Sequence, residues 1–384
     1  MHFFLSALLG CIALVWLLQS LRAARGIGQL PRLADAQPPA DPDCPSISIL
    51  FAARNEAEKL PAAVATLLAQ NYPHYEVVAV DDRSGDATPQ ILDEFARTHE
   101  NLKVVHVASL PRGWLGKPHG LQQAYEHSSG EWLIFTDADV RFDPDVLRRA
   151  IAMARARAFD HLTLLGQVDM MGFWETVTLT YFVLGFSLGV EAWRASRPGS
   201  RRYVGVGSFQ LVQRDVYEAI GTHRRLAMEV VDDMKLGKLV KQGGFRSGAG
   251  LAEDAVRLRW QAGLGNIIRG TTKNFFAAAS YRLSVVACQM GGLLVFSVLP
   301  FAALPFVHGM ARGFALAAML IALAVHGSVA WINRVSPLYA LTHPLGALIF
   351  CYMLLRSTAV TLWQKGIVWR DTFYPLGDLK RGMV

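Results

Sequence analysis

The sequence predicts an α/β fold, in which a mostly parallel sheet is flanked by helices, with transmembrane helices at both ends of the chain. Two patterns in the 384 residues support this prediction. Between residues 47 and 139, short apolar runs of strand character alternate with segments of helical periodicity, which is typical of right-handed β-α-β crossovers. Apolar stretches of about 20 residues, long enough to cross a bilayer, lie near the N-terminus and in the last third.

The composition excludes several classes of protein. Hydrophobic residues make up 52% of the chain and charged residues only 18%, whereas soluble globular proteins carry about a quarter charged residues. The net charge is +7, but no basic run or nucleic-acid motif is present, so we expect no nucleic-acid partner. The four cysteines form no CxxC or Cys/His pattern, which argues against a disulfide framework or a zinc site and favours reduced, cytosol-facing thiols.

Residues 1–25 are predicted to form an N-terminal transmembrane anchor. Phe3–Leu21 carries no charge, and Arg22 and Arg25 follow it. The positive-inside rule then places the C-terminal side of this segment in the cytosol. A cleaved signal peptide is the alternative, although it would carry its positive charge before the apolar core. Residues 26–45 contain five prolines and are predicted to be a Pro-rich linker.

The C-terminal region, residues 284–364, is predicted to contain further transmembrane helices at 284–307, 313–332 and 338–363. One anchor and three spans would place the tail, residues 365–384, outside the cell, yet its lysines and arginines favour the inside. Pro300 and Pro305 interrupt the first stretch, which leaves a re-entrant or broken segment open. We expect a multi-pass protein of the cytoplasmic membrane whose middle part, residues 46–283, faces the cytosol.

A fifth apolar run, residues 170–193, contains Glu175 and Glu191, which are costly to place in lipid. We interpret it as an amphipathic helix lying along the membrane surface. A buried core helix of the soluble domain is the alternative.

The soluble part has a regular order of elements. We predict strands at 47–52, 75–80, 102–106 and 131–136, and helices at 60–69, 88–98 and 119–127. Asp81 and Asp82 follow the second strand, and Asp137 and Asp139 follow the last one. Because the carboxyl ends of parallel strands meet at one edge of a sheet, these acids are expected along one cleft. Turn formation and helix capping are the structural alternatives.

No glycine-rich phosphate motif is present, so the phosphates of a bound nucleotide would need another partner. A divalent cation, Mg²⁺ or Mn²⁺, held by the carboxylates would fill that role. Lys117 lies in a glycine-flexed loop that suits an anionic diphosphate, although it could be a solvated lysine.

Two later segments are candidates for chemistry. Asp232 and Asp233 open an apolar-periodic segment, where a carboxylate could act as general base or simply favour the helix dipole. Arg259 and Trp260 offer a cation and an indole, and could instead anchor the chain at a membrane.

As an ordered set, these motifs resemble family 2 glycosyltransferases, which have the GT-A fold. The set comprises Ala53-Arg-Asn-Glu56, Asp81-Asp-Arg-Ser-Gly-Asp86, Gly113-Trp-Leu-Gly-Lys117, Asp137-Ala-Asp139, Asp232-Asp233 and Arg259-Trp260. The resemblance covers about residues 46–280. With the flanking apolar segments, the chain is most similar to the membrane-bound branch that glycosylates lipids, which includes ceramide glucosyltransferase-like, hopene-associated and carotenoid-associated enzymes.

The resemblance implies a role for each matching residue on the donor side. Arg54 and Glu56 would line the nucleotide pocket, and Asp81 or Asp82 would contact the base and ribose. Asp139, assisted by Asp137, would hold the metal, and Lys117 would lie near the sugar or diphosphate. On the acceptor side, the resemblance implies Asp233 as the base, Arg259 and Trp260 in the catalytic set, and Asp232, Gly207 and Ser208 near the acceptor.

The resemblance implies an inverting, metal-dependent transfer of sugar from a nucleotide-sugar, with a UDP-sugar as the expected donor. The expected acceptor is a hydroxyl of a membrane lipid such as a hopanoid, ceramide, carotenoid or glycerolipid. Transfer to polyprenyl phosphate and a non-catalytic nucleotide-binding scaffold are the alternatives. Val256 stands where the family often has Gln or Arg, with Arg257 as a possible substitute, and this departure argues against a processive polysaccharide synthase.

Overall fold

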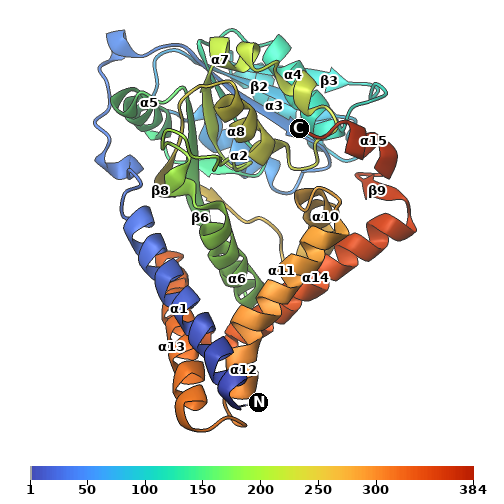
Figure 1. The fold of residues 1–384 in the computed structure, drawn as a ribbon. Helices are drawn as coiled ribbons and strands as arrows, with labels where there is room; N and C mark the ends of the chain where they lie inside the picture. The colour runs from blue at the N-terminus through green and yellow to red at the C-terminus, as the bar shows by residue number, and fades with distance from the viewer. Residues whose placement is uncertain (1) are drawn as a thin grey trace. The chain divides into compact units, whose positions relative to one another are not determined.

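The computed structural model describes residues 2–384, which divide into two parts (Figure 1). The sheet domain comprises Leu30–Asp169, Ala192–Trp260 and Gly377–Val384. The helical domain comprises residues 2–29, Met170–Glu191 and Gln261–Leu376. These limits differ from the predicted ones, because most of the expected linker belongs to the sheet domain. Leu33, for example, is buried in the core of the sheet domain, and the Leu251 N–H donates to the Pro31 carbonyl at 2.8 Å.

The sheet domain alternates strands and helices. In chain order its elements are β1 (Ile47–Ala53), α2 (Leu60–Leu68), β2 (Tyr75–Asp82), α3 (Thr88–Thr98), β3 (Leu102–Val107), α4 (Gly116–Glu126), β4 (Trp132–Phe135), β5 (Arg141–Phe142), α5 (Val146–Arg157), β6 (His161–Val168), β7 (Gln210–Gln213), α7 (Arg214–Ala219), α8 (Asp232–Gln242) and β8 (Ser247–Leu258). The helix α15 (Leu376–Arg381) begins at the last residue of the helical domain, and the rest of it belongs to the sheet domain. The predicted strands and helices between residues 47 and 136 are confirmed, with α4 beginning three residues earlier than expected.

The eight strands form one mixed sheet in the order β3-β2-β1-β4-β7-β6-β8-β5. β1, β2, β3 and β4 are mutually parallel, as predicted. β7 runs antiparallel to both β4 and β6, and the short β5 runs antiparallel to β8. The register places Ala53 beside Asp81, and Asp81 beside His106, so the carboxyl ends of β1, β2 and β3 are level.

β1 lies inside the sheet, and all seven of its residues are buried. Its side chains alternate between two cores: Ile49 and Phe51 pack in one, and Leu50 and Ala52 pack in the other. A strand covered on both faces needs no polar residues, which explains its continuous apolar run. Helices α2, α3 and α5 contribute to the first core, and α4, α7 and α8 to the second.

The helical domain contains most of the long apolar helices. Its elements are α1 (His2–Ile27), α6 (Phe173–Val190), α9 (Leu264–Thr271), α10 (Asn274–Ala278), α11 (Leu283–Leu293), α12 (Leu299–Ala303), α13 (Gly309–Ile332), α14 (His343–Trp363), β9 (Gly366–Trp369) and β10 (Thr372–Pro375). Within residues 2–384, five helical segments are long and apolar enough to cross a membrane: Phe3–Ile27, Phe173–Arg194, Leu283–Ala303, Gly309–Ile332 and Pro337–Trp363.

The stretch before Pro305 is a continuous helix, Leu283–Ala303, whose middle, Leu294–Val298, is π-helical. This wider turn comes just before Pro300, which lacks a backbone donor. The helix ends at Ala303, two residues before Pro305.

Helix α6 packs with the apolar helices of its own domain. The Tyr181 hydroxyl donates to Ser297 Oγ at 2.9 Å, and His326 Nε2 lies 3.1 Å from Thr180 Oγ1. The interpretation of residues 170–193 as a core helix of the soluble domain is therefore wrong, because residues 170–191 belong to the helical domain. A position along the membrane surface stays a prediction.

Both acidic residues near the ends of α6 have partners. Glu175 accepts hydrogen bonds from the backbone N–H groups of Met171 and Gly263, at 3.0 and 2.9 Å. Glu191 forms an ion pair of 2.8 Å with Arg22. The cost of these charges in an apolar setting is reduced by this pairing.

We expect Gly120→Ala to destabilise the sheet domain. A Cβ at this position in α4 would lie 2.6 Å from the Cβ of Ala52 on β1. Overpacking of this kind costs about 1–3 kcal/mol, so the thermal unfolding midpoint should fall by several degrees. Gly265→Ala in α9 is the control, because its nearest neighbour outside the local backbone is 3.7 Å away. An unchanged midpoint for Gly120→Ala would contradict the tight packing of α4 on β1.

Candidate active site

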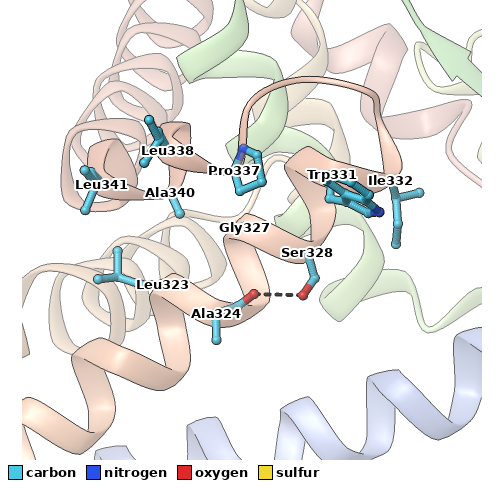
Figure 2. Close-up of a pocket in the computed structure, with 10 residues that line it drawn as sticks. All are labelled: Leu323, Ala324, Gly327, Ser328, Trp331, Ile332, Pro337, Leu338, Ala340 and Leu341. Atoms are coloured by element: carbon cyan, nitrogen blue, oxygen red, sulfur yellow. Dashed lines mark hydrogen bonds between the residues drawn. The ribbon is translucent and has the colours of Figure 1, made fainter.

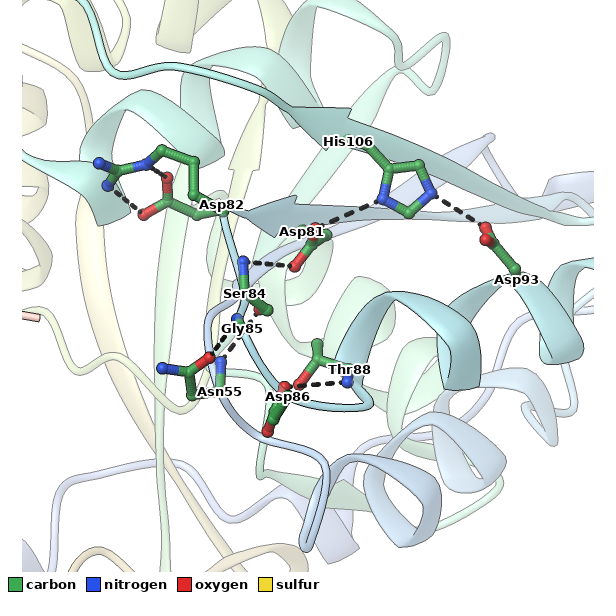
Figure 3. A network of polar contacts seen from close by, with 10 residues as sticks. Asn55, Asp81, Asp82, Ser84, Gly85, Asp86, Thr88, Asp93 and His106 are labelled. Carbon is green, nitrogen blue, oxygen red and sulfur yellow. Dashed lines mark hydrogen bonds and ion pairs between the residues drawn. The ribbon is translucent and has the colours of Figure 1, made fainter.

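The loops after β1 and β2 are joined by hydrogen bonds (Figure 3). The Asn55 N–H donates to Ser84 Oγ at 3.0 Å, and the Gly85 N–H donates to Asn55 Oδ1 at 2.8 Å. The Glu56 N–H donates to Thr88 Oγ1 at 2.9 Å. Asn55 has a left-handed backbone with φ of 56°, which asparagine tolerates well. The loop that contains Arg54 and Glu56 is thus held against the loop that follows Asp81 and Asp82.

Asp81 belongs to a chain of polar contacts that continues through His106 to Asp93 (Figure 3). His106 Nδ1 lies 3.4 Å from Asp81 Oδ2, and His106 Nε2 lies 3.0 Å from Asp93 Oδ1. Burial lowers the pKa of His106, but hydrogen bonds and the charges of the two carboxylates outweigh this and raise it above its usual value. His106 was not predicted as a site residue, although it is the residue before the last of β3, the strand beside β2.

Asp82 is fully buried and paired. The Arg83 guanidinium donates to Asp82 Oδ1 and Oδ2 at 2.7 and 3.1 Å. A Cβ on Gly116, the first residue of α4, would lie 2.3 Å from Asp82 Oδ2. The start of α4 therefore reaches the end of β2 only because residue 116 is glycine.

Lys117, the next residue, joins two groups of carboxylates. Its Nζ lies 2.6 Å from Asp137 Oδ1, beyond the end of β4, and 3.9 Å from Asp232 Oδ2, in the first turn of α8. Burial alone would lower the pKa of Lys117, but the charges of Asp137, Asp232 and Asp233 raise it well above its usual value. The structure thus brings three predicted acidic site residues, Asp137, Asp232 and Asp233, together around the Lys117 ammonium group.

Asp139 is paired with a lysine that sequence reasoning missed. Lys59 Nζ, at the start of α2, lies 2.8 Å from Asp139 Oδ2 and 3.3 Å from the backbone carbonyl of Arg259. Burial and the charge of Asp137 raise the pKa of Asp139, against the lowering effect of Lys59. Lys59 follows Glu56 by three residues and belongs to no motif, so the sequence carried no signal for it.

The segment 205–208 lies against the same carboxylates. A Cβ on Gly207 would lie 2.5 Å from Asp137 Oδ2, and one on Gly205 would lie 2.0 Å from the Asp233 carbonyl. Ser208 is fixed through its backbone, because the Thr136 hydroxyl donates to its carbonyl at 2.8 Å. The glycines allow this segment to pass close to the side chain of Asp137 and the backbone of Asp233.

Arg257 pairs with Asp169 and not with the carboxylates around Lys117 and Lys59. Its guanidinium lies 2.8 Å from Asp169, which also pairs with Arg141 at 2.7 Å. Val256 is buried in the core. Arg257 therefore serves an ion-pair network between β5 and β8, which argues against its acting as a substitute at the site. Arg259 and Trp260 follow the end of β8, and the Arg259 backbone contacts Lys59.

The carboxylates of Asp137 and Asp139 suit a divalent cation whose remaining ligands come from substrate and water. Among residues 2–384, no group of three or more His, Cys, Asp or Glu side chains is placed to hold a metal. Asp137 and Asp139 nonetheless repel each other in a partly desolvated place, as the raised pKa of Asp139 indicates. Mg²⁺ commonly binds one or two carboxylates together with substrate phosphates and water, and these two residues match that pattern.

An open pocket in the helical domain differs in character (Figure 2). It lies between the end of α13 and the 3₁₀ segment Pro337–Thr342, and its lining includes Leu323, Trp331 and Leu338. No residue that lines it is ionisable, so the acid–base groups of the molecule lie elsewhere.

Comparison with known proteins is informative for the sheet domain. Residues 48–220 match the family model of glycosyl transferase family 2. A beta-monoglucosyldiacylglycerol synthase from Synechocystis sp. is 27% identical over 237 residues, which are 58% of this chain and 47% of that protein. A 4,4'-diaponeurosporenoate glycosyltransferase from Staphylococcus haemolyticus is 24% identical over 239 residues, which are 61% of this chain and 62% of that protein. This chain thus spans less than two thirds of the length of either relative.

A solved structure shares the fold. The mannosyltransferase PcManGT from Pyrobaculum calidifontis, in complex with GDP-Man and Mn²⁺, superposes with a TM-score of 0.54 at 22% identity. The match covers 93% of this chain and 99% of that one. The predicted GT-A type of fold, a mixed and mostly parallel sheet flanked by helices, is confirmed.

The His106 contacts predict a pH-dependent contribution to stability. Because the pKa of His106 is raised in the folded state, its contribution is complete below the ordinary histidine pKa and is lost as the pH rises through the folded value. The His106 side chain is 44% exposed, so we expect less than about 1 kcal/mol. In thermal unfolding, the difference between wild type and His106→Gln should shrink from about pH 6 to pH 8. His74→Gln, at an exposed histidine, is the control; a difference that grows with pH would contradict this assignment.

Proposed function

Because residues 48–220 belong to glycosyl transferase family 2, we propose that this chain is a membrane glycosyltransferase that transfers a sugar from a nucleotide-sugar to a lipid hydroxyl. The transfer is inverting, and the donor is a UDP-sugar. The names of the two relatives, a monoglucosyldiacylglycerol synthase and a diaponeurosporenoate glycosyltransferase, support an acceptor of lipid character.

One observation carries this proposal. The Lys117 ammonium lies 2.6 Å from Asp137 and 3.9 Å from Asp232, so the acids on the donor side and the acids on the acceptor side share one side chain. A diphosphate beside Lys117 would leave its sugar near the first turn of α8. Separate binding sites for donor and acceptor would not need this arrangement.

The donor nucleoside would lie along the ends of β1 and β2. Arg54 and Glu56 lie in the first of the joined loops, and Asp81 and Asp82 end β2. The hydroxyl groups of a ribose suit carboxylate acceptors. Asp137 and Asp139 would hold a divalent cation on the diphosphate, and Mn²⁺ and GDP-Man in the mannosyltransferase complex support this use. When bound, the cation supplies Lewis-acid stabilisation of the departing diphosphate.

Asp233 is the general base of the proposed reaction. Its Oδ1 accepts the Met234 N–H at 2.7 Å in the first turn of α8, which fixes the carboxylate. It takes the proton of the lipid hydroxyl as that oxygen bonds to the anomeric carbon. The bond from this carbon to the diphosphate breaks on the opposite face, and the nucleoside diphosphate leaves with the electron pair. Lys117 and Arg259 offset the negative charge that develops.

The helical domain supports membrane association. Its helices are long and apolar enough to cross a bilayer, and a lipid acceptor would be available only at such a surface. We place the protein in the cytoplasmic membrane with the sheet domain facing the cytosol, where nucleotide-sugars are made. The positive charges of Arg22 and Arg25 after the first apolar segment support this orientation.

We expect Asp233→Asn to retain nucleotide binding and to lose about 10²–10⁴-fold in turnover, the usual contribution of a general base. The measurement is transfer of labelled sugar from UDP-sugars to extracted membrane lipids, with the products identified by mass spectrometry. Asp215→Asn is a matched control, because Asp215 also lies in the first turn of a helix and accepts the N–H of the next residue, at 2.8 Å.

Near-normal turnover by Asp233→Asn on a lipid hydroxyl would contradict the assignment of the base. Activity of this variant on polyprenyl phosphate alone would favour that acceptor instead, because a phosphate is already an anion and needs no base. Absence of transfer by the wild-type protein from any nucleotide-sugar would favour a non-catalytic nucleotide-binding scaffold.

A further inference from the structure

Each carboxylate of the Asp137–Asp139 pair has its own lysine, and the two lysines come from different parts of the chain. Lys117 is the second residue of α4, whereas Lys59 directly precedes α2. Only Lys117 belongs to a motif of the family that the sequence resembles. Lys59 therefore needs an explanation of its own, beyond the proposed function.

The position of Lys59 conflicts with a cation on Asp139. Its Nζ lies 2.8 Å from Asp139 Oδ2, within the space that a metal ligated by this oxygen would need. Two cations at one carboxylate oxygen repel each other strongly, even when the carboxylate lies between them. Lys59 and a metal therefore compete for this oxygen, and metal binding there is favoured when Lys59 moves away from Asp139.

Lys59 has the freedom to make this movement. Its side chain is 37% exposed, whereas that of Asp139 is 17% exposed, so the ammonium can enter water at small cost. It also lies 3.3 Å from the Arg259 carbonyl, which offers a second acceptor when Asp139 is taken. This carbonyl belongs to the Arg259–Trp260 pair assigned to the catalytic set.

We propose that Lys59 is the resting counter-ion of Asp139 and competes with the divalent cation for this carboxylate. Lys59 thereby sets the affinity of the site for metal and keeps the acidic pair neutralised before the donor arrives. It is a positioning residue, because it acts through Asp139 and the Arg259 backbone. This inference rests on the metal site of the proposed function.

The experiment measures Mn²⁺ binding to the full chain in detergent by electron paramagnetic resonance, with Mn²⁺ alone and with Mn²⁺ plus UDP. Lys59→Met should bind Mn²⁺ about fivefold more tightly, which corresponds to the loss of a competing ion pair of about 1 kcal/mol. Lys59→Arg keeps the charge and should bind like the wild type. Lys103→Met is the matched control, because Lys103 forms a 2.6 Å ion pair with Glu76 near the amino ends of β2 and β3, at the opposite end of these strands from the site.

The outcomes separate this inference from the proposed function. Equal or weaker Mn²⁺ binding by Lys59→Met, with clear binding by the wild type, would overturn the competition and leave the proposed function intact. Absence of Mn²⁺ binding by every variant, with and without UDP, would overturn both the competition and the metal role of Asp137 and Asp139. Tighter binding by Lys103→Met to the same degree would also overturn the inference, since the effect would then be general to net charge.

Discussion

The candidate active site depends on one electrostatic constraint: Lys117 and Lys59 compensate the charges of several carboxylates at the carboxyl edge of the sheet. Asp137 and Asp139 follow β4, and Asp232 and Asp233 open α8. Carboxylates gathered in one place repel one another unless cations lie between them. In the protein alone, the two lysines supply these cations. In the proposed donor complex, a metal bound to the carboxylates would supply a further one, and a diphosphate requires such cations around it.

Glycines make the close approach possible. Gly116 lets α4 begin against Asp82, and Gly205 and Gly207 let their segment pass the backbone of Asp233 and the side chain of Asp137. Lys117 directly follows Gly116, so one short stretch of chain joins the end of β2 to the end of β4 and the start of α8. The site is thus built by the backbone, and the charged side chains complete it.

Much of this could be predicted from the sequence, because strands buried on both faces show continuous apolar runs, and acids stand at the end of β2 and shortly after β4. The antiparallel β7 and the strands β6 and β8 were not predicted individually, since their runs are short or interrupted by polar residues such as His161 and Glu253. Helix α6 was placed ambiguously because two acids in an apolar run fit several settings. Lys59 and His106 escaped prediction because their roles arise from contacts with residues that are distant in sequence.

The central claim is that Asp137 and Asp139 share one cation beside the donor diphosphate. Anomalous scattering from a crystal of the full chain soaked with Mn²⁺ and UDP tests this most directly. We expect a peak within coordination distance of both carboxylates, with the Lys59 ammonium group displaced from Asp139. A peak elsewhere in the molecule, or a bound diphosphate far from the start of α4, would contradict it.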